Sequence, residues 1–409
     1  MKQQHTLQPK LRFPEFDDSY KNVYLKDIAK FYKGKNISKA DIIEDGAIEC
    51  IRYGELYTTY GEVIDKIVSK TNLDKKNLVF SEANDIIIPA SGESAIDIAT
   101  ASCVIKEGVA LGGDLNIIKS KENGVFLSYY FNNKKKYEIA KKSQGISVIH
   151  IYSDHLKSLN LNIPSLPEQQ KIADYLSTID TKINLLEEKK AQLALYKKAM
   201  MQKLFSQEIR FKDDNGNDFP EWEEKCLGEV FSGLKGQGLS KDSLLIEGEN
   251  NCILYGELFT KYKEIIKSVI SKTNTLSGVK SKCGDILIPA STTTNAFDLA
   301  NATALLLDNV ILGGDINILR PKQKLSSEFY AYYLSNYKKH ELGKLGQGIT
   351  IVHLYYTHFK NIMIDLPSLP EQQKIADFLS AIDESIEKVN EQITQTQSFK
   401  KAMLQQLFV

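Results

Sequence analysis

The string PSLPEQQKIADYLSTID, residues 164–180, occurs a second time as PSLPEQQKIADFLSAID, residues 367–383, with two differences. A further string keeps the same interval of 203 residues, because KKAMMQKLF at 197–205 returns as KKAMLQQLF at 400–408. Matching strings also lie upstream of these helical segments, at offsets of 200 and 201: DIIIPAS at 85–91 with DILIPAS at 285–291, and LGGDLNIIK at 111–119 with LGGDINILR at 312–320. The chain is therefore one module of about two hundred residues, present twice in tandem.

The residues after Leu166 predict one long helix in each module. No glycine or proline occurs between Glu168 and Phe205, and Pro167 falls in the first turn, where its missing N–H costs nothing. Apolar residues recur at alternating spacings of three and four. The predicted stripe comprises Ile172, Leu176, Ile179, Ile183, Leu186, Lys190, Leu193, Tyr196, Met200 and Leu204, and in the second module Ile375, Leu379, Ile382, Ile386, Val389, Ile393, Thr396, Phe399, Met403 and Leu407.

A helix of this length needs a partner helix. About 38 residues extend roughly 57 Å, more than a small domain can cover. The other module offers a stripe of equal length and near-heptad period, which favours a coiled coil, and pseudo-twofold symmetry requires the two helices to be antiparallel. Because LRFPEF at 11–16 echoes the segment 209–222 that follows the first helix, we expect the N-terminus near the end of the second helix. The helices then serve as a spacer or, alternatively, only hold the chain together.

The segments before the helices predict mixed α/β (α+β) domains. Short β-branched runs such as DIIIP alternate with glycine, asparagine, serine and proline. The predicted architecture is two globular domains, residues 1–163 and 208–366, separated by a long antiparallel two-helix coiled coil formed by residues 164–207 and 367–409.

The composition is that of an ordinary folded protein, with 42% hydrophobic and 25% charged residues. No apolar run is long enough to span a membrane, and the start of the chain lacks the apolar core of a signal peptide, so we expect a cytoplasmic protein. Five cysteines without C-x-x-C spacing predict free buried thiols rather than disulfides or zinc. The 52 basic and 52 acidic residues cancel, but lysine-rich runs such as 119–142 permit DNA binding.

No catalytic or metal-binding motif is found. The string GKLGQGIT at 343–350 has Ile349 where a phosphate loop needs lysine, and no Asn-Pro-Pro-Tyr or Asp-Pro-Pro-Tyr methyltransferase string occurs. The matched pairs His150 and His353, and His155 and His358, have no repeated nucleophile beside them, so satisfied or DNA-facing positions are favoured. These absences indicate a binding protein.

Candidate DNA-binding residues are polar positions in loops where the modules share a frame, together with loop positions at which they differ. Arg, Asn, Gln and Thr are the side chains that read base edges, although ordinary drift in surface loops is the alternative at any single position. The candidates are Lys33, Lys35, Asn36, Arg52, Ser91, Gly92, Glu93, Ser94, Gln144 and Ser147 in the first module, and Lys235, Gln237, Thr292, Thr293, Thr294, Asn295, Gln347 and Thr350 in the second.

The tandem LPEQQKIA strings at 166–173 and 369–376, with RFPEF near the start, resemble the specificity subunits of type I restriction-modification systems. The resemblance implies a non-catalytic subunit whose two target recognition domains each read half of a split double-stranded DNA sequence. It also implies two modification subunits that bind S-adenosylmethionine, and restriction subunits that hydrolyse ATP and cut DNA. S-adenosylmethionine, ATP and Mg are then expected on those partners, with no cofactor in this chain.

The helix openings are the predicted docking sites for the modification subunits. The candidate partner-binding residues are Leu166, Glu168, Gln169, Ile172, Leu369, Glu371, Gln372 and Ile375. Two other classes remain open: an adaptor whose domains bind proteins without DNA specificity, and an enzyme with an unfamiliar site.

Overall fold

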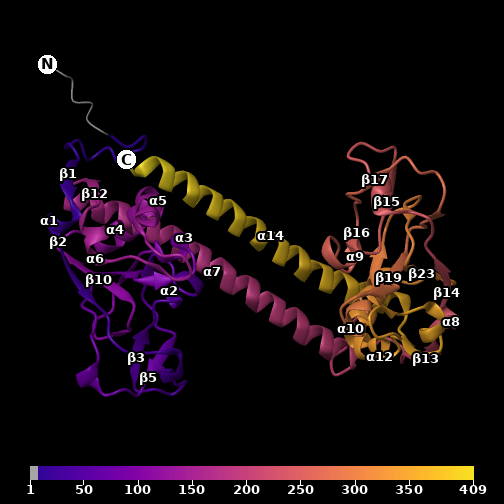
Figure 1. Ribbon diagram of the computed structural model, residues 1–409. Helices are drawn as coiled ribbons and strands as arrows, with labels where there is room; N and C mark the ends of the chain where they lie inside the picture. Colours follow the sequence, from indigo (N-terminus) through magenta and orange to yellow (C-terminus); the bar gives the residue numbers. More distant parts are fainter. Residues whose placement is uncertain (1–7) are drawn as a thin grey trace. The chain divides into compact units, whose positions relative to one another are not determined.

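The computed structural model describes residues 8–409 (Figure 1), so the first seven residues of the predicted first domain lie outside its description. The chain forms two compact units. The first contains the residues up to Glu187 together with Glu391–Val409, and the second contains Glu188–Asn390. Each unit therefore combines one mixed α/β domain with a part of each long helix.

Each domain is built on a mixed five-stranded sheet of the same topology. In the first unit the order is β2 (Ala29–Lys33), β10 (Leu115–Ser120), β6 (Asp85–Pro89), β8 (Ser102–Val104) and β4 (Val63–Ile64). In the second it is β14 (Phe231–Lys235), β23 (Ile316–Pro321), β19 (Asp285–Pro289), β21 (Thr303–Leu305) and β16 (Ile265–Ile266). All neighbours are antiparallel except the last pair in each sheet. The strands β6 and β19 are buried throughout, as their unbroken apolar runs predict.

Smaller sheets complete each domain. The first unit has β5 (Ser69–Thr71), β3 (Ile48–Ile51) and β9 (Ala110–Leu111), and the second has β17 (Lys272–Thr273), β15 (Asn250–Ile253), β22 (Ile311–Leu312) and β18 (Val279–Lys280). Four two-stranded pairs are β1 (Lys21–Tyr24) with β12 (Asn160–Ile163), β7 (Ser91–Gly92) with β11 (Ile149–His150), β13 (Glu223–Cys226) with β25 (Met363–Leu366), and β20 (Ser291–Thr292) with β24 (Val352–His353).

Short helices connect these strands. In the first unit they are α1 (Leu25–Ile28), α2 (Glu55–Thr58), α3 (Ala95–Ile98), α4 (Gly124–Tyr130), α5 (Lys136–Lys142) and α6 (Ser153–Lys157). In the second they are α8 (Leu227–Val230), α9 (Glu257–Thr260), α10 (Ala296–Leu299), α11 (Ser327–Tyr332), α12 (Lys339–Lys344) and α13 (Tyr356–Phe359). A π-helical turn joins α4 to α5 and another joins α11 to α12, at Phe131–Lys135 and Tyr333–Tyr337.

The long helices have the predicted extent, with α7 spanning Leu166–Phe205 and α14 spanning Leu369–Leu407. In the first unit Leu407, at the end of α14, shares a core with Ile172 and Leu176 at the start of α7. In the second unit the end of α7 meets the start of α14 in the same way. The antiparallel pairing is thus confirmed within each unit.

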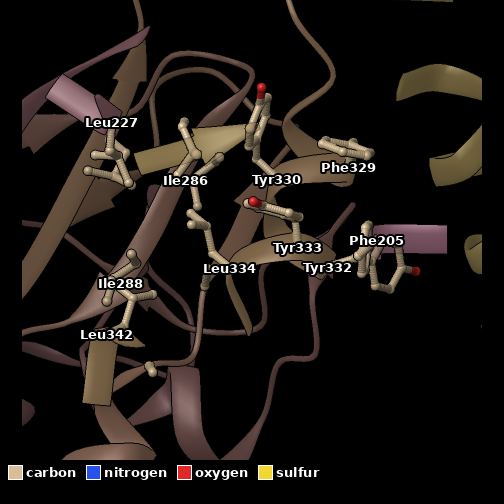
Figure 2. Close-up of a cluster of buried hydrophobic side chains, with 14 of the residues drawn as sticks. Phe205, Leu227, Ile286, Ile288, Phe329, Tyr330, Tyr332, Tyr333, Leu334 and Leu342 are labelled. Atoms are coloured by element: carbon tan, nitrogen blue, oxygen red, sulfur yellow. The ribbon is translucent and has the colours of Figure 1, made fainter. Parts of the chain in front are cut away.

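An aromatic side chain from the end of a long helix enters the core of each domain. Phe205 packs edge-on against Phe329 and Tyr333, with ring centroids 5.6 and 5.4 Å apart, and lies next to Tyr332 (Figure 2). In the first unit the equivalent residue is Phe408, which is 3% exposed and lies 5.5 Å from Phe126 and 5.7 Å from Tyr130. The core of each domain is therefore completed by a phenylalanine at or directly after the end of a long helix. The helix α7 of the first module supplies it to the second domain, and α14 of the second module supplies it to the first domain.

The expected position of the N-terminal segment is confirmed. The backbone N–H of Leu11 donates a hydrogen bond of 3.1 Å to the carbonyl of Gln406, near the end of α14.

The predicted apolar stripe is wrong near the end of each long helix. Tyr196 and Phe399, both assigned to it, are 48% and 47% exposed, whereas Lys197 is buried. The Nζ atom of Lys197 lies 2.8 Å from both carboxylate oxygens of Asp383, and the equivalent Lys400 lies 2.7 Å from Asp180. A buried ion pair shifts the contact line by one residue, because an inward-pointing lysine with a carboxylate partner occupies the position that periodicity assigns to an apolar side chain.

The LGGD strings form turns between strands, as predicted, but their glycines do not supply the positive φ. That conformation belongs to Asp114 and Asp315, each with φ 57°, which is a conformation that aspartate tolerates. A glycine is needed instead on the facing segment: a Cβ on Gly34 would lie 1.9 Å from the carbonyl oxygen of Gly112, and Gly236 meets Gly313 in the same way.

The five cysteines are unpaired in disulfides, as predicted, but only Cys50, Cys103 and Cys252 are buried. Cys226 is half-buried and Cys283 is exposed, so the expectation of buried thiols is wrong for these two. Within residues 8–409, no helix combines the length and the apolar character that crossing a bilayer requires.

Candidate nucleic-acid interface

Backbone hydrogen bonds gather the candidate loops of the first domain at one edge of its central sheet. The N–H of Lys35 donates to the carbonyl of Leu111 at 3.0 Å, just after β2, and the N–H of Ala90 donates to Asp114 at 2.7 Å, just after β6. The N–H of Ile151, after β11, then donates to Ala90 at 2.9 Å. The segments 33–36, 90–94 and 144–151 are therefore neighbours, although they are up to 118 residues apart in the sequence.

The second domain repeats this arrangement bond for bond. Gln237 donates to Leu312 at 3.0 Å, Ala290 donates to Asp315 at 2.8 Å, and Leu354 donates to Ala290 at 3.0 Å. A buried asparagine closes the edge in each domain: Nδ2 of Asn116 donates to the carbonyl of Ile151 at 3.0 Å, and Asn317 donates to Leu354 at 2.7 Å.

The structure divides the predicted residues by exposure. In the first domain, Glu93 and Gln144 are exposed and Ser94 is half-buried. In the second domain, Gln347 is exposed and Thr292 is half-buried. Ser91 and Gly92 are buried because β7 pairs with β11, and a Cβ on Gly92 would lie 2.4 Å from Ile98. The remaining exposed candidates are Lys33, Lys35, Asn36, Ser147, Lys235, Gln237, Thr293, Thr294, Asn295 and Thr350. Buried Ser91 therefore supports the loop, and the side chains around it form the accessible surface.

The loop of the second domain is ordered by its own polar residues. The Oδ1 atom of Asn295 accepts a hydrogen bond of 2.9 Å from the N–H of Phe297 and caps α10. The hydroxyl groups of Thr292 and Thr294 lie 2.9 Å apart, and Thr294 also donates to Asp298. Three of the four loop candidates, Thr292, Thr294 and Asn295, thus have a structural task in addition to any contact with a ligand.

The exchange of Arg52 for Leu254 has an explanation inside the domain. The guanidinium of Arg52 lies 3.0 Å from the buried carboxylate of Glu55. In the second domain the equivalent Glu257 pairs at 2.6 Å with Lys261, where the first domain has Thr59. A buried carboxylate needs a cation, and each domain supplies it from a different position. A role for Arg52 in base recognition stays a prediction.

A cationic and aromatic stack borders each group of loops. The Nζ atom of Lys33 lies 5.9 Å from the ring centroid of Tyr152, which stacks on His150 at 6.0 Å and 12°. In the second domain Lys235 lies 5.1 Å from Tyr355, which stacks on His353 at 5.4 Å and 15°. The two tyrosines were not predicted as site residues, although each lies two residues after one of the matched histidines, His150 and His353.

Four of the eight predicted partner-binding residues have side-chain hydrogen bonds inside the domain. Glu168 is fully buried and its two oxygens accept hydrogen bonds of 2.9 and 2.7 Å from Arg12, and Glu371 accepts bonds of 3.1 and 3.0 Å from Arg210. These bonds raise the pKa of both guanidinium groups. The arginine of each RF string, near the start of the chain and after α7, is therefore the ion-pair partner of the buried glutamate in the first turn of a long helix.

The neighbouring glutamines bind the domain. Oε1 of Gln169 accepts a hydrogen bond of 3.0 Å from the N–H of Asn123, at the start of α4, and Gln372 accepts one of 2.9 Å from Ser326, at the start of α11. Ile172 and Ile375 are buried, Leu369 is half-buried, and Leu166 is 50% exposed. A docking role for this region stays a prediction. Because the other predicted residues at the start of α7 are buried, only the exposed residues around Leu166 are accessible to a partner.

The buried lysine clusters are features that the sequence analysis missed. Lys400 lies 3.1 Å from Glu62 and 2.7 Å from Asp180, whose second oxygen accepts a 2.5 Å bond from Tyr129. Burial lowers the pKa of Lys400, but the two carboxylates raise it by more. The two lysines, Lys197 and Lys400, and the two aspartates, Asp180 and Asp383, all lie in the duplicated strings. The recurrence of these charged residues in both modules is the sequence signal that could have identified them.

In the described part of the chain, no three His, Cys, Asp or Glu side chains are grouped so that they could hold a metal ion. What both domains present instead is a set of exposed polar and cationic side chains at one sheet edge. Together with the tandem repeat, this makes the chain a two-domain protein in which both domains carry an equivalent polar loop surface.

The chain belongs to the family of type I restriction modification DNA specificity domains, which matches residues 17–195 and 220–396. The resemblance predicted from the LPEQQKIA strings is confirmed. The chain is 27% identical to the type I restriction enzyme MjaVIII specificity subunit of Methanocaldococcus jannaschii, over 96% of this chain and 92% of that protein. It is 28% identical to the EcoR124I/EcoR124II specificity subunit of Escherichia coli over 44% of this chain and 45% of that protein.

Solved structures have the same fold. The S subunit of a type I restriction-modification system from M. genitalium superposes with a TM-score of 0.63 at 17% identity, over 98% of this chain and 99% of that one. A chain from a structure of complex assembly and conformational transition in a type I R-M system gives 0.55 at 17% identity, over 95% and 97%.

Proposed function

We propose that this chain is the DNA-recognition subunit of a type I restriction-modification complex, in which each domain binds one half of a two-part DNA sequence. The observation that carries the proposal is the pair of matched loop groups, 33–36 with 90–94 and 144–151, and their equivalents in the second domain. Family membership supports DNA as the ligand, and the exposed lysines and amides are chemically suited to phosphates and base edges.

The chain contributes no reacting group in this proposal. S-adenosylmethionine, ATP and Mg belong to modification and restriction subunits, and the relatives are named specificity subunits. The paired helices set the distance between the half-sites and dock two modification subunits, one for each module. Pseudo-twofold symmetry implies that the half-sites are bound in inverted orientation.

The two half-sites are expected to be related but different. The domains share the hydrogen bonds that hold the loops, but segment 92–96 in the first domain corresponds to segment 292–297 in the second, which is one residue longer. The test exchanges segment 92–96 for segment 292–297 and maps adenine methylation in genomic DNA from cells that carry the variant and the modification subunit. One half of the methylated sequence should change and the other should stay.

A matched control exchanges segment 43–47 for the equivalent 245–249, which directly precedes β3 and β15 and contains none of the candidate residues. The control should leave the methylated sequence unchanged. If the loop exchange alters both halves or neither, the loops do not determine the sequence. If the assembled wild-type complex shows no affinity for duplex DNA, the protein-binding adaptor is the better description.

A further inference from the structure

Each domain presents an exposed isoleucine at the tip of one loop. This loop joins α5 to β11 in the first domain and α12 to β24 in the second. Ile146 is 99% exposed and Ile349 is 100% exposed, and these residues are equivalent in the two modules. Val148 and Ile351, two residues further on, are about half exposed. Single exposed apolar residues are ordinary on protein surfaces, but here both modules keep an isoleucine at the same tip, whereas the neighbouring segments 92–96 and 292–297 differ.

The tips are held in place by a rigid base. Gln144 and His150 exchange two backbone hydrogen bonds, of 3.0 and 2.7 Å, and Gln347 and His353 exchange two of 2.8 and 2.7 Å. The turn needs glycine, because Gly145 and Gly348 have φ of 132° and 128° and a Cβ on either would lie 2.0 Å from a carbonyl oxygen of the same turn. The loop therefore fixes its isoleucine in an outward position.

The surroundings of the tips favour DNA as the contacted molecule. His150 and His353, at the base of the tips, stack on Tyr152 and Tyr355, and a lysine lies over each of these tyrosines. The tip is also continuous with the exposed candidates Gln144 and Ser147 in one domain and Gln347 and Thr350 in the other. An apolar point bordered by cations and amides complements a stacked base step framed by phosphates.

We propose that Ile146 and Ile349 are apolar wedges, each making contact with the bases of the DNA that its domain binds. This inference rests on the proposed function and deepens it, because it assigns to each domain an anchor that does not depend on the half-site sequence. Apolar wedges of isoleucine, leucine or phenylalanine are a general means of gripping a base step. The variable side chains beside the wedge then discriminate between sequences.

The test measures binding of the chain, assembled with its modification subunits, to a duplex that contains the methylated sequence found by genomic mapping. Ile146→Ala and Ile349→Ala are each expected to lower the affinity about five- to fifty-fold. Each substitution removes three carbon atoms from a side chain that becomes buried against the bases in the complex. Ile146→Leu should restore most of the affinity. The slope of log affinity against log salt concentration should stay unchanged, since no phosphate contact is removed.

The matched control is Ile246→Ala. Ile246 is 99% exposed and lies before β15, at the end of that strand opposite Leu254, and its equivalent in the first domain is Glu44. This variant should bind DNA like the wild type. Lys33→Ala provides the contrast, since loss of a phosphate contact should reduce the salt slope by about one.

The outcomes separate the inference from the proposed function. If the wild type binds its methylated sequence and Ile146→Ala binds equally well, the wedge is overturned and the specificity function stands. If mass measurement shows that Ile146→Ala has lost its modification subunit, the tip is a protein contact and the wedge is likewise overturned. If the wild-type assembly binds no duplex, both proposals fail.

Discussion

Phe408 offers a sharp test of how the end of the chain stabilises the first domain. Its ring is 3% exposed and lies against Phe126 and Tyr130, so Phe408→Ala leaves a cavity in the core that also contains Ile172 and Leu176. Truncation of a buried phenylalanine typically costs about 3–5 kcal/mol of unfolding free energy. For a unit of about 200 residues, each kcal/mol lowers the melting temperature by about 2–4 °C, so a fall of roughly 6–20 °C is expected.

The assay combines thermal unfolding with hydrogen exchange measured by mass spectrometry. Exchange should accelerate in β6 and β10 of the first domain and stay unchanged in β19 and β23 of the second. Phe205→Ala is the mirror variant and should reverse this pattern. Phe399→Ala, on the same helix but 47% exposed, is the control and should change stability by less than about 0.5 kcal/mol. A melting temperature within about 2 °C of the wild type, with unchanged exchange in β6, would refute the reasoning.

Three further predictions follow from the proposed function. The purified chain, incubated with duplex DNA, S-adenosylmethionine and Mg, should leave the DNA unmethylated and uncut, and methyl transfer by the chain alone would favour the enzyme alternative. Mass measurement of the assembled methylase should find two modification subunits per chain, because the docking region occurs once in each module; a ceiling of one would contradict this. Four residues inserted near Lys190 add about 6 Å of helix and turn it by only about 40°, so the gap between half-sites should lengthen by about one or two base pairs at about 3.4 Å each. An unchanged gap with full activity would mean that the helices do not measure it.

The long helices and the modular repeat were predictable, because strict periodicity, the absence of glycine and proline, and duplicated strings are strong local signals. The error at Tyr196 and Phe399 arose because an apolar stripe was extended past the point where Lys197 and Lys400 turn inward. Periodicity alone treats lysine as a surface residue, and only the carboxylate of Asp383 or Asp180 makes its burial possible. The sequence carried that partner, but about 190–220 residues away.

The candidate interface was predictable as a set of loops and unpredictable as a surface. Backbone bonds such as those of Ala90 with Asp114 and Ile151 bring the segments together, and the sequence does not reveal pairings at this separation. Exposure was the second unknown. Ser91 and Gly92 are buried by the pairing of two very short strands, and Glu168 by Arg12, so residue type alone assigned them to a surface that they do not reach.

The phenylalanine at the end of each long helix affects how domains can be exchanged between related chains during evolution. Phe205 and Phe408 fill equivalent sockets, and the lysine, aspartate and tyrosine beside each socket are the same in both modules. A domain exchanged from another chain with the same core residues would therefore pack against an equivalent phenylalanine, whether it became the first or the second domain. The exposed loop residues such as Glu93, Gln144 and Ser147 are not members of that core, so they can diverge while the packing of the phenylalanine is retained.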